Sequence, residues 1–164
     1  MDTSFQKTSA SDEWATPPEI VKALGEFDLD PCATERSAKA PVFFTKEQDG
    51  LKQDWFGRVW CNPPYSQPAL YQFCEKMAEH GNGILLIFAR TGNKVWQEII
   101  FPKATAILFL RKRVRFLQPD GTPGGSAGCD SALVAFGKGN AEALRRFNLQ
   151  FEGALLCLSP YWND

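Results

Sequence analysis

The stretch GILLIFA at residues 83–89 is a continuous apolar run of the kind that forms strands buried on both faces of a parallel sheet. A second run of this kind, TAILFL, occupies residues 105–110. Between them, NKVWQEIIFPKA at residues 93–104 has its apolar residues at helical spacing. Because a strand, a helix and a strand follow one another, these segments predict an α/β fold with a mostly parallel sheet.

The same alternation continues toward the N-terminus. A helix is predicted at residues 16–27, TPPEIVKALGEF, because Thr16 and Glu19 have the spacing of a capping box and a proline stands at the first helical position. Hydrophobic patterning and turn residues predict the other elements of this part of the chain: short strands at residues 27–33, 41–44 and 57–62 and a helix at residues 68–81.

The C-terminal part is predicted to hold an antiparallel strand pair. RVRFL at residues 113–117 and SALVAFG at residues 131–137 have strand-like composition, and a Pro-, Gly- and Ser-rich loop at residues 118–128 joins them. The chain's 164 residues suit one domain, which we place at residues 13–164 after a flexible polar N-terminus at residues 1–12.

Composition excludes several classes of protein. Hydrophobic residues make up 44% of the chain and charged residues 23%, with a net charge of -1, which is typical of a globular protein and not of a disordered or fibrous one. The 5 cysteines are odd in number and lack C-x-x-C spacing, so neither a disulfide framework nor a metal site is expected. No apolar stretch is long enough to span a membrane, and the N-terminus lacks the apolar core of a signal peptide, so a cytoplasmic protein without a membrane partner is expected.

Polar residues follow three of the predicted strands directly. Asp28 and Asp30 stand at the end of the first strand, residues 62–65 follow the third, and Arg90 and Thr91 follow the run GILLIFA. In parallel sheets the carboxyl ends of the strands share one edge, and ligands bind beyond it. The sequence therefore predicts a single site at this edge of the sheet.

Two short motifs at these strand ends resemble those of a known enzyme family. NPPY at residues 62–65 resembles the catalytic motif of amino-methyltransferases that use S-adenosylmethionine, and DPCA at residues 30–33 resembles the cofactor-binding first motif of N6-adenine methyltransferases. With EWATPPEIV, DGLKQDW, FART and RVRFLQPDG, the chain is similar to the small phage- and prophage-encoded DNA N6-adenine methyltransferases over residues 13–137. The resemblance implies a single-domain, Rossmann-like methyltransferase fold without a separate target-recognition domain.

The chemistry of adenine methylation explains the residue types in the NPPY motif. The exocyclic N6 is a poor nucleophile, because its lone pair is delocalised into the ring. The side-chain oxygen of Asn62 and the backbone carbonyl oxygen of Pro63 would accept the two N6–H bonds, while Pro63 and Pro64 stiffen the turn. Tyr65 would stack on an adenine that has rotated out of the duplex. Such a site works by positioning and hydrogen bonding, without a general base before methyl transfer.

The resemblance also implies the cofactor, S-adenosylmethionine, and the residues that hold it. Thr16 at a helix N-terminus would meet the cofactor carboxylate, although a helix cap explains the same residue. Asp30 would bind the methionine end, with a turn cap as the alternative, and Asp49 would lie near the adenosine, with a plain Asp-Gly turn as the alternative. The cofactor-binding residues predicted in this way are Thr16, Pro17, Asp30, Pro31, Cys32, Ala33 and Asp49.

One segment departs from the pattern of larger methyltransferases. These enzymes follow their first motif with a glycine-rich turn and a full helix. Here TERSAKAP at residues 34–41 has no glycine and is too short for that helix. Part of the cofactor pocket is therefore expected to be built differently.

Double-stranded DNA is the expected partner. Arg111, Lys112, Arg113 and Arg115 form a basic cluster in the sequence. Its arginines would contact phosphates, although a solvated basic strand is the alternative. Arg90 and Thr91 would contact the substrate, and the loop at residues 118–128 would choose the target sequence. The alternatives are an RNA adenine or a protein glutamine amide as methyl acceptor, or a non-catalytic phage protein that binds DNA or the cofactor.

Overall fold

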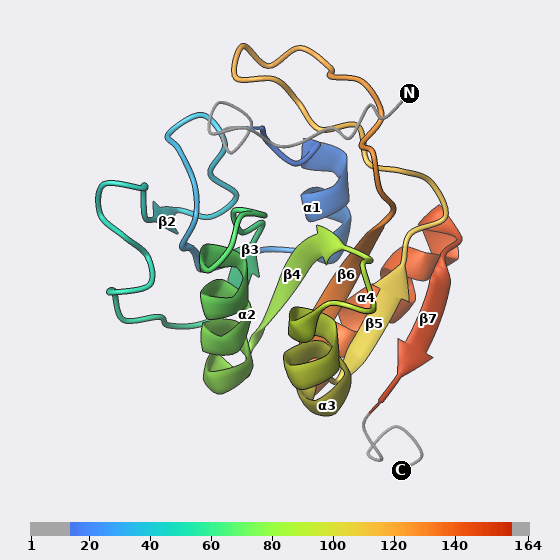
Figure 1. Cartoon of the computed structure of the whole chain (residues 1–164). Helices are drawn as coiled ribbons and strands as arrows, with labels where there is room; N and C mark the ends of the chain where they lie inside the picture. The colour runs from blue at the N-terminus through green and yellow to red at the C-terminus, as the bar shows by residue number, and fades with distance from the viewer. Residues whose placement is uncertain (1–13, 159–164) are drawn as a thin grey trace.

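A seven-stranded mixed sheet lies at the centre of the molecule, with the strand order β2-β1-β3-β4-β6-β5-β7 (Figure 1). The structure is a computed structural model that describes residues 14–158, so the predicted flexible N-terminus at residues 1–12 lies outside the described residues. The strands are β1 (Leu29–Asp30), β2 (Val42–Phe43), β3 (Val59–Cys61), β4 (Gly83–Phe88), β5 (Ala106–Phe109), β6 (Ser131–Phe136) and β7 (Ala154–Cys157).

The prediction of a mostly parallel sheet is wrong. Strands β2, β1, β3 and β4 pair in parallel, but β6 lies between β4 and β5 and is antiparallel to both, and β7 is antiparallel to β5. An apolar run such as β4 reports burial on both faces and carries no information on the direction of the neighbouring strands. The α/β class itself is confirmed.

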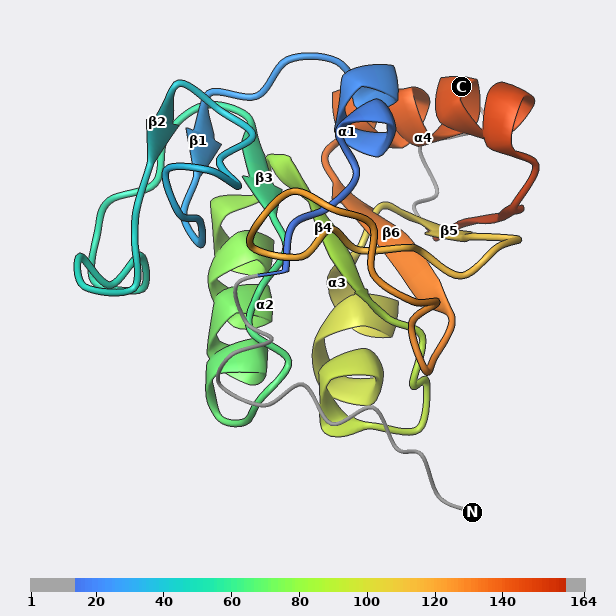
Figure 2. The ribbon, with the colours of Figure 1, turned by 90° about the horizontal axis from the view of Figure 1, so that it is seen from above.

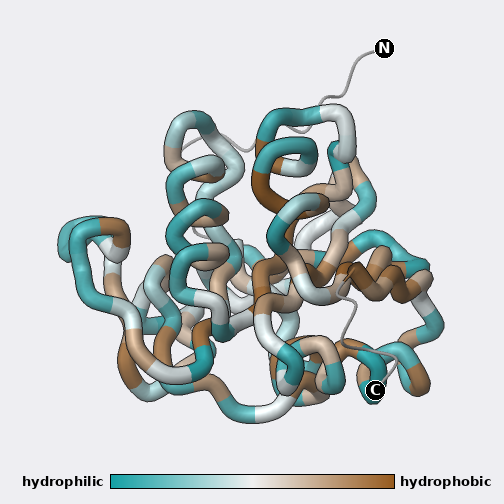
Figure 3. Tube along the Cα trace, turned by 90° about the horizontal axis from the view of Figure 1, so that it is seen from below, coloured by the Kyte–Doolittle hydropathy of each residue, from teal (hydrophilic) through white to brown (hydrophobic). Residues whose placement is uncertain are grey.

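Helices cover both faces of the sheet (Figure 2). One face carries α1 (Pro18–Leu24) and α4 (Lys138–Phe151), and the other carries α2 (Ala69–His80), the π-helix η2 (Val95–Ile100) and α3 (Phe101–Lys103). Successive residues of β4 alternate between the two hydrophobic cores, since Ile84 and Leu86 pack with α1 and α4 while Leu85 and Ile87 pack with α2 and η2. Hydrophilic and hydrophobic residues alternate along the helices, as expected when one side of each helix faces the sheet (Figure 3).

Two local predictions are corrected by the structure. Thr16 does not cap α1: Pro17 occupies the N-cap position, and no side chain makes a capping hydrogen bond there. RVRFL at residues 113–117 is not a strand paired with β6; Leu117 forms isolated bridges with Ala15 and Pro123 instead. In addition, α4 and β7 lie in a region where no elements were predicted. Among residues 14–158, no helix combines the length and the apolar character needed to cross a membrane.

Candidate active site

A cavity of about 660 Å³ opens where β1 and β3 end. Its walls come from the residues before α1, the segment after β1, the loop before β3 and the turn that follows β3. Asn62 and Pro64 of the NPPY motif line the cavity. Of the predicted cofactor-binding residues, the structure places Thr16, Asp30, Pro31, Cys32, Ala33 and Asp49 in its lining, but not Pro17.

Both ends of the Asn62 amide are held by hydroxyl groups. Its Nδ2 donates to Oγ1 of Thr16 at 3.3 Å, and the Tyr65 hydroxyl donates to its Oδ1 at 2.9 Å. Thr16 is buried, and Asn62 follows the fully buried strand β3, so neither residue has much freedom to move. An amide oxygen has two lone pairs, so Oδ1 can accept a further hydrogen bond from a substrate amine.

Tyr65 is fixed at both ends of its side chain. Its ring stacks on Phe88 with a centroid separation of 4.3 Å and an interplanar angle of 28°. The single proton of its hydroxyl is shared between Oδ1 of Asn62 and the C=O of Leu86, whose oxygen lies at 3.0 Å. Burial of the hydroxyl raises the pKa of Tyr65 well above its usual range, so the phenol remains a neutral donor. The sequence motif thus becomes a rigid unit in which Tyr65 helps to orient the Asn62 oxygen.

Asp30 is a buried carboxylate, with only 2% of its surface exposed. Its two oxygens accept backbone N–H bonds from Cys32 at 3.3 Å and from Lys39 at 3.0 Å, so Asp30 shapes the turn that follows β1. Burial raises the pKa of Asp30 to about 7, against the opposing effects of these N–H groups and of the Lys39 charge. A buried carboxylate of this kind is suited to a cationic group of a ligand.

Two short segments form the cavity wall where larger methyltransferases have a glycine-rich turn. After β1, the chain folds back through reciprocal bonds between Thr34 and Ser37, whose side chains accept each other's backbone N–H groups at 3.2 and 2.8 Å. Gly50 packs so closely on Pro31 that a Cβ at position 50 would collide with the Pro31 carbonyl oxygen. Asp49 has a positive φ of 54° and its Oδ1 accepts the N–H of Leu51 at 3.2 Å, so it forms a turn and also lines the cavity.

Trp14, Lys39 and Gly50 are among the residues of this wall that were not assigned to the site from the sequence. Trp14 lines the cavity, and a Cβ at Gly124 would collide with its ring, so the loop at residues 118–128 packs directly against this wall. Lys39 lines the cavity beside Asp30. The Asp-Gly pair at residues 49–50 carried a turn signal, whereas nothing in the pattern distinguished Trp14 or Lys39 from other residues of their types.

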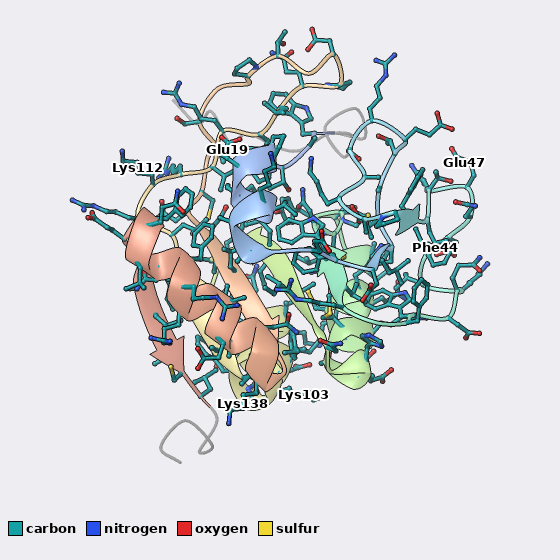
Figure 4. All side chains as sticks on the ribbon, turned by 180° about the vertical axis from the view of Figure 1, so that it is seen from behind. Glu19, Phe44, Glu47, Lys103, Lys112 and Lys138 are labelled. Carbon is teal, nitrogen blue, oxygen red and sulfur yellow. The ribbon has the colours of Figure 1, made fainter. Side chains whose placement is uncertain are left out.

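The basic cluster lies outside the cavity lining and is partly neutralised. Arg111 pairs with Glu152 at 2.6 Å and Arg113 pairs with Asp130 at 3.1 Å. Lys112 and Arg115 are exposed. In residues 14–158 no ion pair is found for either of these two, and Lys112 projects outward from the molecule (Figure 4).

Arg90 and Thr91 also lie outside the cavity lining, just beyond β4. The Arg90 guanidinium lies 5.7 Å from the centre of the Phe88 ring, which in turn stacks on Tyr65. The C=O of Thr91 accepts a hydrogen bond from Gln97 at 2.7 Å. Arg90, which was predicted to contact the substrate, is therefore separated from Tyr65 of the NPPY turn only by the Phe88 ring.

The structure thus places a rigid Asn-Pro-Pro-Tyr turn beside a cavity at the strand ends, and this cavity has the size of a small-molecule site. The profile of the family described as DNA N-6-adenine-methyltransferase (Dam) matches residues 3–149. The chain belongs to this family. The predicted family is thereby confirmed, and nothing in the comparisons favours the RNA, protein-glutamine or non-catalytic alternatives.

Two phage proteins show the extent of the similarity. The chain is 32% identical over 126 residues to the DNA N-6-adenine-methyltransferase of Haemophilus phage HP1 (strain HP1c1), covering 71% of this chain and 73% of that protein. It is 35% identical over 94 residues to the DNA N-6-adenine-methyltransferase of Escherichia phage T1, covering 52% of this chain and 39% of that protein. No solved structure gives a significant match.

Proposed function

We propose that the chain transfers the methyl group of S-adenosylmethionine to N6 of an adenine that has rotated out of duplex DNA. The observation that carries this proposal is the Asn62 amide, held between Thr16 and Tyr65 at the wall of the cavity that also contains Asp30. Family membership supports DNA adenine as the acceptor. We also propose that the sheet is a Rossmann-like methyltransferase sheet into which β6 is inserted, and that the protein acts in the cytoplasm of a bacterial host.

The cavity fits the proposed cofactor. Its volume of about 660 Å³ is within the usual range for small-molecule sites, and it combines apolar walls such as Leu51 and Phe73 with the buried carboxylate of Asp30. Asp30 would hold the cofactor's methionine end, and Asp49 would lie near its adenosine. When bound, S-adenosylmethionine supplies an electrophilic methyl group on a sulfonium. It requires no metal, and among the described residues no three His, Cys, Asp or Glu side chains form a metal-binding group.

The residues of the NPPY turn prepare the adenine amine for attack. Oδ1 of Asn62 and the C=O of Pro63 accept the two N6–H bonds, which favours a pyramidal nitrogen with a localised lone pair. In the part of the chain that the structure describes, no backbone N–H group donates to the Pro63 carbonyl. Because the acceptors are preorganised, they stabilise the positive charge that develops on N6 in the transition state.

A methyl-transfer assay tests this function. The protein is incubated with radiolabelled S-adenosylmethionine and, separately, with unmethylated duplex DNA, RNA or a glutamine-containing peptide. Label is expected in duplex DNA alone and should be recovered as N6-methyladenine after hydrolysis. Label in RNA or peptide alone would identify a different acceptor, and no label in any sample would contradict the enzyme assignment.

Tyr65→Ala is expected to weaken binding to DNA that contains target adenines by roughly 1 to 3 kcal/mol, the usual contribution of base stacking on an aromatic ring. A duplex made only of G·C pairs offers no adenine to stack, so its affinity should not change. Tyr65→Phe keeps the ring and should retain the stacking, but it removes the donor to Asn62 and should slow methyl transfer. Equal loss of affinity for both duplexes with Tyr65→Ala would contradict the stacking role.

Replacing both Arg113 and Arg115 with glutamine is expected to flatten the salt dependence of DNA binding. Each lost phosphate contact changes the slope of log affinity against log salt by about 0.9 for duplex DNA. Arg115 should account for most of the change, because Arg113 is already paired with Asp130. Lys138→Gln is the matched control, since Lys138 is exposed and begins α4, at the other end of this helix from Glu152, the partner of Arg111. An unchanged slope in the double variant would show that these two cations face solvent only.

A further inference from the structure

Lys39 and Asp30 form an adjacent cation and anion in the same cavity. The backbone N–H of Lys39 donates to Oδ2 of Asp30 at 3.0 Å, and both residues line the cavity at the end of β1. Asp30 is buried and Lys39 is half-buried. Within residues 14–158, neither side chain has an ion-pair partner. The cavity thus contains a buried acid and a half-buried lysine that attract each other without forming a direct ion pair.

The pKa shifts of Lys39 and Asp30 agree with their burial in the cavity. Burial lowers the pKa of Lys39, against the opposing effects of Asp30 and Glu19, and burial raises the pKa of Asp30. Each charged form is therefore disfavoured by its surroundings. A ligand that brings one charge of each sign would relieve both costs together.

The amino-acid end of S-adenosylmethionine is such a ligand group, because it carries an ammonium and a carboxylate on the same carbon. We propose that Lys39 binds the carboxylate of this amino-acid end, beside Asp30, which binds its ammonium group. This inference rests on the proposed function and names the residue that completes recognition of the cofactor. It also gives a role to the segment at residues 34–41, which lacks the glycine-rich turn of larger methyltransferases.

The N-terminus of α1 is a poor alternative site for the carboxylate. Pro17 and Pro18 have no N–H group, and the N–H of Ile20 already donates to the C=O of Pro17 at 3.1 Å. The Thr16 hydroxyl accepts a hydrogen bond from Asn62 and keeps its own O–H as an uncharged donor. This short helix end therefore offers only uncharged donors to an anion, whereas Lys39 offers a positive charge.

Lys46 is the other lysine of the cavity lining, and it differs from Lys39 in its surroundings. It is exposed and lies in the loop before β3, on the segment that also contains Asp49. Water solvates an exposed ammonium well, so pairing it with a ligand has little effect on affinity. This difference favours Lys39 over Lys46 as the partner of the carboxylate.

Calorimetric binding of two ligands tests the proposal. S-adenosylhomocysteine has the complete amino-acid end, whereas 5′-methylthioadenosine has the same nucleoside and sulfur but no amino-acid group. Lys39→Met is expected to weaken binding of S-adenosylhomocysteine on the order of 10-fold, the effect of losing a charge-assisted bond in a partly desolvated site. Binding of 5′-methylthioadenosine should change by less than about 2-fold, which also reports that the variant is folded. Lys39→Arg should retain most of the affinity, and Lys138→Met, at an exposed lysine outside the cavity lining, should behave like the wild type.

The outcomes separate this inference from the proposed function. If the wild-type protein does not bind S-adenosylhomocysteine, the proposed cofactor, and with it the proposed function, is contradicted. If the wild type binds but Lys39→Met loses affinity equally for both ligands, or for neither, Lys39 does not recognise the carboxylate. A second test needs no variant. It compares the binding of S-adenosylhomocysteine to the wild-type protein with that of an analogue that keeps the amine but lacks the carboxylate. Its affinity should be on the order of 10-fold weaker, and an unchanged affinity would overturn the proposal.

Discussion

Asn62→Ala should slow methyl transfer by about two to three orders of magnitude, as removal of one preorganised hydrogen-bonding group from an active site commonly does. The alanine leaves the Pro63 carbonyl in place but removes the second acceptor for the adenine N6–H groups. Thr16 and Tyr65 would also lose their shared hydrogen-bond partner. The affinity for S-adenosylhomocysteine should change little, because the cofactor's charged end is assigned to Asp30.

Single-turnover kinetics is the appropriate measurement, because it reports the chemical step independently of product release. Asn93→Ala is the matched control, since Asn93 is an exposed asparagine near the start of η2 and does not line the cavity. Its rate should equal that of the wild type. A near-normal single-turnover rate for Asn62→Ala would show that Asn62 has no catalytic role. A large loss of cofactor affinity would show instead that Asn62 binds the cofactor.

The sequence predicted the elements that carry strong local signals. The continuous apolar run of β4 and the helical spacing of α2 both appear in the structure at the predicted places. The position of β6 was not predictable in this way, because strand order depends on contacts between distant segments. The C-terminal helix α4 did carry a usable signal, since Ala141, Leu144 and Phe147 recur at helical spacing and are all buried.

The candidate site likewise has residues that the sequence predicted and residues that it did not. Asn62 and Asp30 were predictable, because polar residues that end buried strands tend to gather at one edge of a sheet, and β1 and β3 are indeed parallel neighbours. The loops that close the cavity were not predictable. Gly50 meets Pro31, and Trp14 meets Gly124, only because the chain returns from far along the sequence. Lys39 belongs to this second group, since its importance depends on its position beside Asp30.

Cofactor affinity should depend on pH through Asp30. In the free protein the pKa of Asp30 is raised to about 7 by burial, so near pH 6 its carboxyl group is mostly protonated. An ammonium group binds the ionised form, which must lose this proton before or during binding. The affinity for S-adenosylhomocysteine should therefore rise with pH by up to about 10-fold per unit below pH 7, and should level off above it.

Calorimetry in buffers of different ionisation enthalpy, between about pH 5.5 and 7.5, measures this effect directly as proton release on binding. Asp30→Asn should lower the affinity by roughly 1 to 3 kcal/mol at the upper end of this range and remove the pH dependence. His80→Gln is the control, because His80 contacts Gly57 at the far end of α2 from the cavity. The wild-type profile needs no variant and is decisive by itself. Affinity that stays constant across the range, without proton release, would show that the Asp30 carboxylate does not bind the ammonium group of the cofactor.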